Sequence, residues 1–570
     1  MLRVEKIETL EALRALETSW NSLVMQANSD GIFLSHEWFS CWWKVFAGSK
    51  KLFILTVKSD NALVAIAPLM ISSRKRLGRV TKTVEFIGRP DSVCYDFIAL
   101  DMTAAGEEIV NYLVENVDGW DRIEFSNIPG DSRFLEIFKS ALSGRGKGFL
   151  VRTRTPKEFS PASSHLPVHD DTAPLKISGD ELAAFKSWGE LEFEEISDLK
   201  DINSNMPVFF QLHINSRRHH PQQSKFNSSL CRRFYYELSK SLAPSKRVSL
   251  LRLRACDIPV SYGLCFVSDG ALRLYDVASN PLFGDLSPDL LFIKMVAESC
   301  RKRNFAFQVL DLAGLPSDSL SDSRVGICDI SAYAAKLTYK TASIKKRLAD
   351  FGPIRSYMQR ENVAVAREKL RAISQKQGFN RLLVAMINKA LETLGHAIFV
   401  NREYYVYRHS GGQEKLLRIK VEVEVRKFCL TDINRIASFY GCRPGDPKYE
   451  TFKKRFEKGA DCYVALHHGY PVCIIWGLYH EDYHSELNLS LKPAAGEVII
   501  SDALTAPIYR SMGIAPYLFA FMLNDYHESG YRAIAAISKS NMPSRKGLEI
   551  YDFKHVGTLR IIKIFGIRII

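Results

Sequence analysis

The sequence predicts an α/β (α+β) protein of three tandem units, each a mixed, mainly antiparallel twisted sheet flanked by helices. The first observation is length, because 570 residues are too many for one hydrophobic core and domains usually span about 100–200 residues. The second is a recurring order of patterns, in which helical periodicity, a meander of alternating strands, a further helix and a further strand follow one another.

The first unit is predicted over residues 1–165. Helical patterns cover LEALRALETSWNSLVMQA and FLSHEWFSCWWKVF, and the alternating runs KLFILTVKS and ALVAIAPLMIS flank Asp60 and Asn61 as in a β-hairpin. The strands TVEFIG and YDFIAL, the helix AGEEIVNYLVENV and the strand DRIEFSNI complete an α/β unit with an antiparallel component.

The second unit, residues 166–345, repeats this order without obvious sequence identity. A helix at FYYELSKSLA precedes three strands with turns near Asp257 and Ser268, then a helix at SPDLLFIKMVAESCRKR and a strand at AFQVLDLAG. Residues 346–414 are predicted to form a helical linker. Because its second helical stretch is apolar on more than one face, we expect a buried inter-domain helix, with peripheral membrane contact as the alternative.

The third unit is predicted over residues 415–570. LLRIKVEVEVRKF alternates like a strand, LTDINRIASFYG is helical, and DCYVALHHGYPVCIIWGLYH forms a hairpin at His468 and Gly469. The apolar strand EVIISDALTA leads through a turn into the long helix of PIYRSMGIAPYLFAFMLNDYHESG, and the strand YRAIAAISKS follows.

Composition restricts the function classes. The net charge of +14 suits a polyphosphate cofactor, anionic lipid or nucleic acid, but the basic residues are spread along the chain without a nucleic-acid-binding signature, so we expect no nucleic-acid partner. The eleven cysteines form no CxxC pair, so we expect neither a disulfide framework nor a metal site. With no secretory signal and no apolar run of about 18 residues, the expected location is the cytoplasm.

The segment from Thr505 to Ala515 carries the strongest chemical signal. It is a turn between an apolar strand and an apolar helix, so several backbone N–H groups at the start of the helix have no intrahelical partner. These donors and the positive end of the helix dipole suit a pyrophosphate. Gly513 and Ala515 leave room for phosphate oxygens to approach the backbone, and Arg510 adds a positive charge.

This segment resembles the acyl-CoA-binding motif of the GNAT superfamily of N-acetyltransferases. Pro507, an aromatic residue and Arg510 precede a glycine, an isoleucine and a small residue, and the downstream pair Asn541 and Ser544 resembles another family motif. The resemblance implies that strand residues from Ala503 run beside the pantetheine of acetyl-CoA, or of another acyl-CoA, next to a bulge that splays the sheet. The cofactor-binding residues that it implies are Leu504, Thr505, Arg510, Ser511, Met512, Gly513, Ile514, Ala515, Asn541 and Ser544.

The catalytic residues are less defined by the resemblance. Many family members have a tyrosine that protonates the leaving thiolate where this chain has Leu548, and Tyr551 lies about one helical turn further on. Glu497 and Asp502 on the strand before the loop, with Glu486 on the preceding strand, are candidate general bases, although each also fits a solvated carboxylate at a strand edge. Catalysis can also rest on holding the amine against the thioester.

The first two units resemble cellulose-biosynthesis-associated acetyltransferases, which are related to Fem-type aminoacyltransferases. The likeness rests on residues 33–43, on Tyr95-Asp96-Phe97, and on the motifs LHINSRR and FYYEL with Ser287-Pro288 and the sequence DLAG at 311–314. The chain departs from the family in having Asp289 after Ser-Pro and a Tyr-Lys pair only at 339–340. Neither unit has the phosphate loop, so we expect the first unit to be non-catalytic. We expect the two units together either to bind an acceptor or a partner or to have a structural role.

Together these features predict an N-acyltransferase, most simply an N-acetyltransferase, that moves an acyl group from acyl-CoA to a primary amine. The favoured acceptor, a small molecule or glycan such as an amino sugar in cell-surface polysaccharide synthesis, rests on family analogy alone. Two alternatives stay open: a Fem-like aminoacyltransferase acting on a cell-wall precursor, and a non-catalytic scaffold with partners in a polysaccharide-synthesis complex. The oligomeric state stays open as well.

Overall fold

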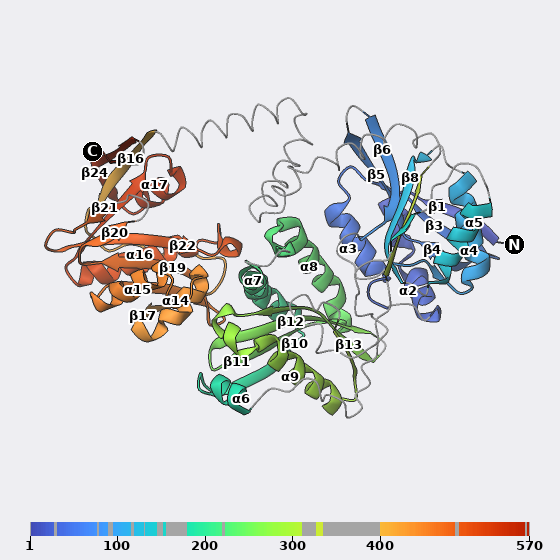
Figure 1. Ribbon diagram of the computed structural model, residues 1–570, viewed down its shortest axis with the longest axis horizontal. Coiled ribbons are helices and arrows are strands. Elements are labelled where there is room, and N and C mark those ends of the chain that lie inside the picture. The colour runs from blue at the N-terminus through green and yellow to red at the C-terminus, as the bar shows by residue number, and fades with distance from the viewer. Residues whose placement is uncertain are drawn as a thin grey trace.

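Three groups of sheets and helices follow the chain, with the second unit between the first and the third (Figure 1). No helix in the described part of the computed structural model is long and apolar enough to cross a membrane. The described residues are 2–27, 31–76, 79–88, 95–115, 119–129, 132–144, 152–154, 179–218, 223–268, 270–309, 327–333, 399–484, 489–564 and 567–568.

The first unit has a four-stranded and a six-stranded sheet. Asp60 and Asn61 both have positive φ angles, 48° and 70°, as a tight hairpin turn requires, and this confirms the predicted β3–β4 hairpin. Its elements are β1 (Leu2–Ile7), α1 (Leu10–Ala15), α2 (Glu17–Gln26), α3 (His36–Phe46), β2 (Lys51–Leu52), β3 (Ile54–Ser59), β4 (Ala62–Ala67), β5 (Leu69–Arg76), β6 (Arg79–Phe86), β7 (Ile98–Ala99), α4 (Met102–Glu115), β8 (Arg122–Pro129), α5 (Arg133–Gly144) and β9 (Arg152–Arg154).

The second unit is a five-stranded sheet in the order β10-β11-β12-β13-β14. The hydrophobic faces of β11 to β13 are buried under α9 and α7. Its elements are α6 (Gly179–Lys186), β10 (Leu191–Ile196), α7 (Leu199–Ser216), η2 (Lys225–Asn227), α8 (Ser229–Leu242), η3 (Ala243–Ser245), β11 (Val248–Ala255), β12 (Ile258–Ser268), β13 (Ala271–Ser279), η4 (Pro281–Leu286), α9 (Pro288–Lys302) and β14 (Ala306–Val309).

The third unit is an eight-stranded sheet in the order β17-β18-β19-β22-β23-β16-β24-β25, beside a short pair β20-β21. Its elements are β16 (Phe399–His409), β17 (Glu424–Phe428), η7 (Leu430–Asp432), α14 (Ile433–Tyr440), α15 (Pro447–Glu457), β18 (Asp461–His467), β19 (Tyr470–Leu478), β20 (Asp482–His484), β21 (Leu489–Leu491), β22 (Glu497–Thr505), η8 (Pro507–Tyr509), α16 (Ile514–Glu528), β23 (Arg532–Ser538), α17 (Met542–Glu549), β24 (Phe553–Ile564) and β25 (Ile567–Arg568).

One topological feature recurs in all three units. An antiparallel meander contains a strand that pairs in parallel with a strand on the far side of a helix, as in β6–α4–β8, where β7 precedes the helix, β13–α9–β14 and β22–α16–β23. A parallel pair needs such a crossover, because its strands cannot be joined by a tight turn. The recurrence confirms the predicted fold class of three tandem α/β units with mainly antiparallel sheets.

Two strands pair outside the unit in which the sequence placed them. Strand β15 (Ile327–Tyr333), assigned to the second unit, pairs with β8 and β9 in the first. Strand β16 falls within the predicted linker 346–414, yet it lies between β23 and β24 of the third sheet. No strand is predicted at 327–333, and residues 399–409 fall in the predicted helical linker, so the structure differs from the prediction in having a strand at both places. The predicted helices of residues 346–398 lie outside the described residues.

The units share buried contacts. Trp38 of α3 packs against Phe234 and Phe266 of the second unit, with ring centroids 5.3 and 5.9 Å apart. Its neighbours belong to a buried cluster that continues through α7 into the third sheet. Helix α7 therefore has one face against the second sheet and another against the third unit, where it contacts η8.

Candidate functional site

The predicted phosphate loop is a sharp turn between β22 and α16. Ser511 and Gly513 have positive φ angles of 65° and 85°, and α16 begins directly after Gly513. Glycine adopts this left-handed conformation without the steric cost that a side chain brings. A Cβ at Gly513 would also lie only 3.1 Å from the Arg418 carbonyl oxygen, so the loop requires glycine both for its conformation and for its contact with residues 418–419.

The first turn of α16 presents open hydrogen-bond donors. The helix has no side-chain cap, and among the described residues no acceptor contacts the backbone N–H groups of Gly513, Ile514 or Ala515. Pro516 has no N–H group, and the N–H of Tyr517 already donates to the Gly513 carbonyl at 3.1 Å. Three adjacent donors at the positive end of a 15-residue helix form the local arrangement that binds phosphate groups.

Two cations flank this loop. Arg510 is exposed, with its Nε 3.4 Å from the Thr505 carbonyl oxygen. Lys420, which sequence reasoning missed, donates from Nζ to the Ser511 carbonyl at 3.2 Å and from its backbone to the Met512 carbonyl at 3.0 Å. No motif in the sequence indicates this contact, because residue 420 precedes β17 at the far edge of the sheet.

Strands β22 and β23 separate beside the loop. Their parallel pairing covers only Glu497 to Ile499 of β22. A register shift opposite β19 then places an extra residue at Asp502 and Ala503, and Asp502 has a positive φ of 46°. The shift is the β-bulge expected before Thr505. The carboxyl-terminal halves of the two strands are thus unpaired with each other, and Ala503, Leu504 and Thr505 are partly or fully exposed there.

Asp502 lies at this bulge within a polar cluster. Its carboxylate binds Nη1 of Arg455 at 2.6 Å, and Arg455 also binds Asp482 at 2.8 Å. The Tyr440 hydroxyl donates to the Asp502 carbonyl at 2.9 Å. Burial, with the nearby negative charge of Asp502, raises the pKa of Tyr440 well above its usual value, so the hydroxyl keeps its proton. Sequence reasoning missed Tyr440 and Arg455, which lie on helices distant in the sequence from the loop.

The other carboxylates do not approach the loop. Glu497 starts β22, where it binds Arg408 at 2.9 Å. An extended strand rises about 3.3 Å per residue, so Glu497 is roughly 26 Å along β22 from Thr505. Glu486 lies outside the described residues. Of the carboxylates singled out from the sequence, the structure places Asp502 near the loop and Glu497 at the opposite end of the strand.

The downstream motif residues divide into two groups. Asn541 accepts a hydrogen bond from the Ser544 amide at 3.3 Å as the cap of α17. Both residues are exposed just beyond β23, at the same edge of the sheet as the loop. Tyr551 is buried and donates from its hydroxyl to the Pro516 carbonyl at 2.7 Å, and burial raises its pKa to about 12. Its proton is therefore engaged by α16, and Leu548 is part of the core.

Helix α7 of the second unit contacts η8, the short helix that precedes the loop. The Ile508 amide donates to Oε1 of Gln211 on α7 at 3.5 Å. The hydroxyl of the buried Tyr509 lies 3.0 Å from Nδ1 of His467. Burial, and then the charge of neighbouring His468, lowers the pKa of His467 to about 3, so this histidine is neutral at physiological pH.

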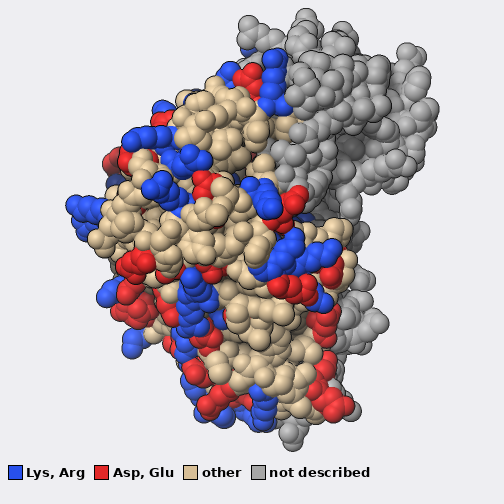
Figure 2. Space-filling view, turned by 90° about the vertical axis from the view of Figure 1, so that its left-hand side faces the viewer, with Lys and Arg blue, Asp and Glu red and all other residues tan. Residues whose placement is uncertain are grey.

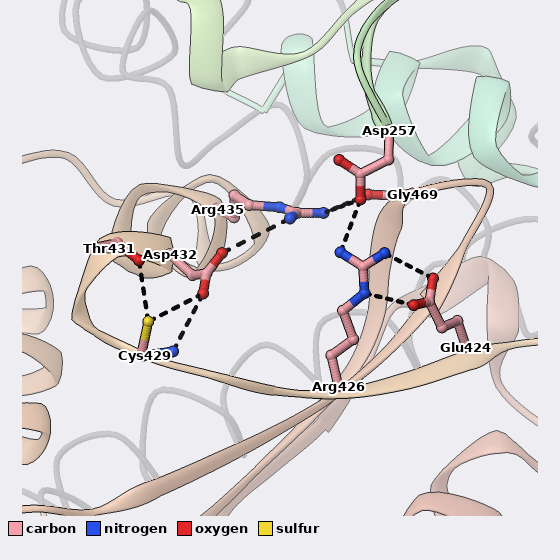
Figure 3. Close-up of polar contacts among 8 residues, drawn as sticks. All are labelled: Asp257, Glu424, Arg426, Cys429, Thr431, Asp432, Arg435 and Gly469. Carbon is pink, nitrogen blue, oxygen red and sulfur yellow. Dashed lines mark hydrogen bonds and ion pairs between the residues drawn. The ribbon is translucent and has the colours of Figure 1, made fainter. Parts of the chain in front are cut away.

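Ion pairs join the two units next to this contact (Figure 3). Asp257, in the turn between β11 and β12, binds Nη1 of Arg426 at 3.0 Å and Nη2 of Arg435 at 3.7 Å. Arg435 also donates to the Gly469 carbonyl at 3.0 Å. A Cβ at Gly469 would overlap the Asp257 carbonyl, so the two turns are in direct backbone contact.

The equivalent place in the second unit has different chemistry. Asp276 is as far along β13 from its first parallel pair as Asp502 is along β22. Burial would raise the pKa of Asp276, but His213 at 3.0 Å and Lys225 at 2.9 Å outweigh it and hold that pKa well below its usual range. Asp289, in the first turn of α9, accepts a hydrogen bond from Ser279. A side-chain carboxylate thus lies in the first turn of α9, where α16 has open N–H groups.

Comparison with known proteins identifies the second unit. Residues 180–318 match the model of the acetyltransferase (GNAT) domain family. No curated protein matches the chain. The described residues contain no group of side chains that could hold a metal ion.

Solved structures of 73 chains match as well. A putative GNAT-family acetyltransferase from Novosphingobium aromaticivorans is 13% identical with a TM-score of 0.21, over 28% of this chain and 63% of that one. FemX is 10% identical with a TM-score of 0.37, over 59% and 99%. A GNAT-family acetyltransferase from Colwellia psychrerythraea is 12% identical with a TM-score of 0.22, over 65% and 98%. The chain thus spans less than two thirds of the first of these relatives.

The family match confirms the resemblance to GNAT acetyltransferases. The protein is a chain of three tandem α/β units, and it contains a GNAT acetyltransferase domain at residues 180–318. This domain lies in the second unit, whereas the loop with open donors is in the third.

Proposed function

We propose that the chain is an acyl-CoA-dependent N-acyltransferase whose donor site is the loop from Arg510 to Ala515. The observation that carries the proposal is the set of open N–H groups at Gly513, Ile514 and Ala515, at the point where β22 and β23 separate. Acetyl-CoA is the simplest donor. Its pyrophosphate would accept hydrogen bonds from these groups, with Arg510 and Lys420 balancing its charge.

The bulge supplies the reacting end of the site. An acyl-pantetheine arm along Ala503 to Thr505 would place the thioester beside backbone N–H groups that β23 leaves unpaired, and such groups polarise a carbonyl. The amine then attacks the thioester carbon, loses a proton and displaces the thiolate of coenzyme A. Asp502 is the carboxylate placed to take that proton, directly or through water. Tyr551 is held by α16, so orientation of the reactants replaces a dedicated acid in this proposal.

Transfer from radiolabelled acetyl-CoA to a panel of amines, including amino sugars, tests the activity with the full chain. We expect Arg510→Gln to raise the KM for acetyl-CoA about tenfold, as loss of one charged contact of ~1.4 kcal/mol predicts. Arg532→Gln, at the paired end of β22 and β23, is the matched control and should leave the KM unchanged. Equal effects of both variants, or no label transfer from acetyl-CoA, would refute the donor site.

An amino sugar or another precursor of cell-surface polysaccharide is the acceptor class that we propose by family analogy. A second candidate activity is Fem-like aminoacyl transfer. It rests on the resemblance of the first two units to Fem-related enzymes and on the second unit's lack, within its described residues, of a loop with open N–H groups. Incubation with aminoacyl-tRNA and acetyl-CoA in parallel separates the two activities, because each consumes one donor. A scaffold without catalytic activity would consume neither.

A further inference from the structure

The junction of the second and third units borders the reacting end of the proposed site. Tyr440 ends α14, and its hydroxyl holds the carbonyl of Asp502 at the bulge. The chain then turns at Gly441, with a φ of 68°, into a loop that leads to α15. A molecule that binds beside Asp502 on this face of the sheet therefore lies close to the residues that contact Tyr440.

Two cations, one from each unit, contact Tyr440. Arg218, from the end of α7, donates from Nη1 to the Tyr440 carbonyl at 2.5 Å, and a Cβ at Gly441 would overlap its guanidinium. The Lys448 ammonium lies 4.1 Å from the centroid of the Tyr440 ring. Arg443 lies in the intervening loop, where its backbone amide uses the carboxylate of Asp446 at 2.8 Å.

These cations differ from the other cations at the same junction. Arg426 and Arg435 are both within ion-pair distance of Asp257 (Figure 3). Within the described ranges, no carboxylate lies within ion-pair distance of the side chains of Arg218, Arg443 or Lys448. On the face that Figure 2 shows, Lys and Arg are generally interspersed with Asp and Glu.

The charges of Arg218 and Lys448 reach a common point. Burial raises the pKa of the Cys442 thiol, the charges of Lys448 and then Arg218 oppose that shift, and the nearby carboxylate of Asp446 adds to it. Like charges gathered in this way repel one another, and a bound anion relieves the repulsion. The guanidinium of Arg218 uses two of its five donors, to Tyr440 and to Asn215, so the others are available to a carboxylate or phosphate.

We propose that the acceptor amine carries an anionic group, a phosphate or a carboxylate, which Arg218 of the second unit binds together with Lys448 of the third. This inference rests on the proposed function, since it takes the bulge at Asp502 as the reacting end. The amine lies toward Asp502, whose carboxylate is 42% exposed, and the anionic group lies toward the cations. Arg218 and Lys448 then determine acceptor specificity, and the second unit contributes to a site whose donor loop is in the third.

Calorimetric titration of the full chain with three small amines tests the proposal. Phosphoethanolamine carries a phosphate, β-alanine a carboxylate, and ethanolamine neither. The titrations are run with and without saturating coenzyme A, which occupies the donor loop in the first case. We expect phosphoethanolamine or β-alanine to bind at least tenfold more tightly than ethanolamine in both conditions, and the stronger of the two identifies the anionic group.

Variants test whether Arg218 and Lys448 are the source of the preference for anionic amines. Arg218→Gln with Lys448→Gln should weaken the preferred anionic amine at least tenfold and leave ethanolamine unchanged, whereas Arg218→Lys should keep most of the preference because it keeps the charge. Arg426→Gln, at the paired end of the junction, is the control, and equal thermal midpoints exclude unfolding. Equal binding of the three amines, absence of binding by all three, or an unchanged preference in the double variant overturns the proposal. The proposed function fails separately, by absence of acetyl-CoA binding to the parent chain.

Discussion

Replacing Ala515 by aspartate should weaken ligand binding at the loop without lowering the stability of the protein. Ala515 is the second residue of α16, and Asp289 is the second residue of α9, so the variant copies into the third unit an acid that the second already has. A carboxylate in the first turn of a helix stabilises it by about 0.3–1 kcal/mol through the helix dipole. The same carboxylate would occupy the open N–H groups and repel a pyrophosphate.

The size of the binding loss follows from the hydrogen bonds at risk. Charge-assisted bonds contribute about 1.5–3 kcal/mol each, so loss of two weakens acetyl-CoA binding by about 3 kcal/mol or more, which is at least a hundredfold. The dissociation constant by calorimetry and the thermal midpoint by scanning fluorimetry are the two readouts. We expect the dissociation constant for acetyl-CoA to rise, while the thermal midpoint of the unliganded protein equals that of the parent or rises.

Ala515→Asn is the matched control, because it has nearly the same shape without the charge. It should bind acetyl-CoA more tightly than the aspartate variant. If Ala515→Asp binds acetyl-CoA as the parent does while remaining folded, the phosphates do not contact this helix and the donor site is misassigned. Ala515 is a cleaner test than Gly513, since the positive φ of Gly513 makes any side chain there strain the loop.

Three further predictions concern catalysis and stability. Asp502→Asn should lower kcat by about 10²-fold or more, as loss of a general base does, and should leave the affinity for acetyl-CoA unchanged. The control Glu497→Gln should leave kcat unaltered. Steady-state kinetics measures both variants, and an equal loss of kcat in the two would contradict the assignment of Asp502. Tyr551→Phe should keep kcat and cost about 0.5–1.5 kcal/mol of unfolding free energy in urea, whereas a loss of kcat alone would make this tyrosine the acid. The pKa of His467 is lowered to about 3, so the unfolded chain binds more protons between about pH 3 and 6.5 and stability falls as pH falls through that window. His467→Gln should flatten this dependence in urea unfolding measured from pH 7 to 4, and an unchanged slope would show that His467 is not its source.

The sequence predicted the parts of the site that depend on local structure. A strand, a turn with Gly513 and an apolar helix indicate a helix N-terminus, and the bulge before Thr505 followed from the family resemblance. Both are in the structure. Residue type alone could not decide whether Asp502 or Glu497 is the better candidate for the general base. Their separation along one strand does place them at different ends of that strand.

Contacts between segments distant in the sequence were not predictable. Residues 399–409 were predicted as part of a helical linker, whereas they form a strand between β23 and β24. Nothing in the helical pattern of α7 indicates that Gln211 supports Ile508 or that Arg218 reaches Tyr440. These contacts depend on the packing of the second unit against the third.

Amide hydrogen exchange by mass spectrometry tests the central claim most directly, because it locates the donor site. The open N–H groups of Gly513, Ile514 and Ala515 should exchange rapidly in the free chain, since no acceptor in the described part of the chain holds them. The account predicts that acetyl-CoA slows exchange in peptides covering residues 503–517 and leaves those covering the start of α9 at 281–291 unchanged. Protection at 281–291 without protection at 503–517, or protection at neither, would contradict it.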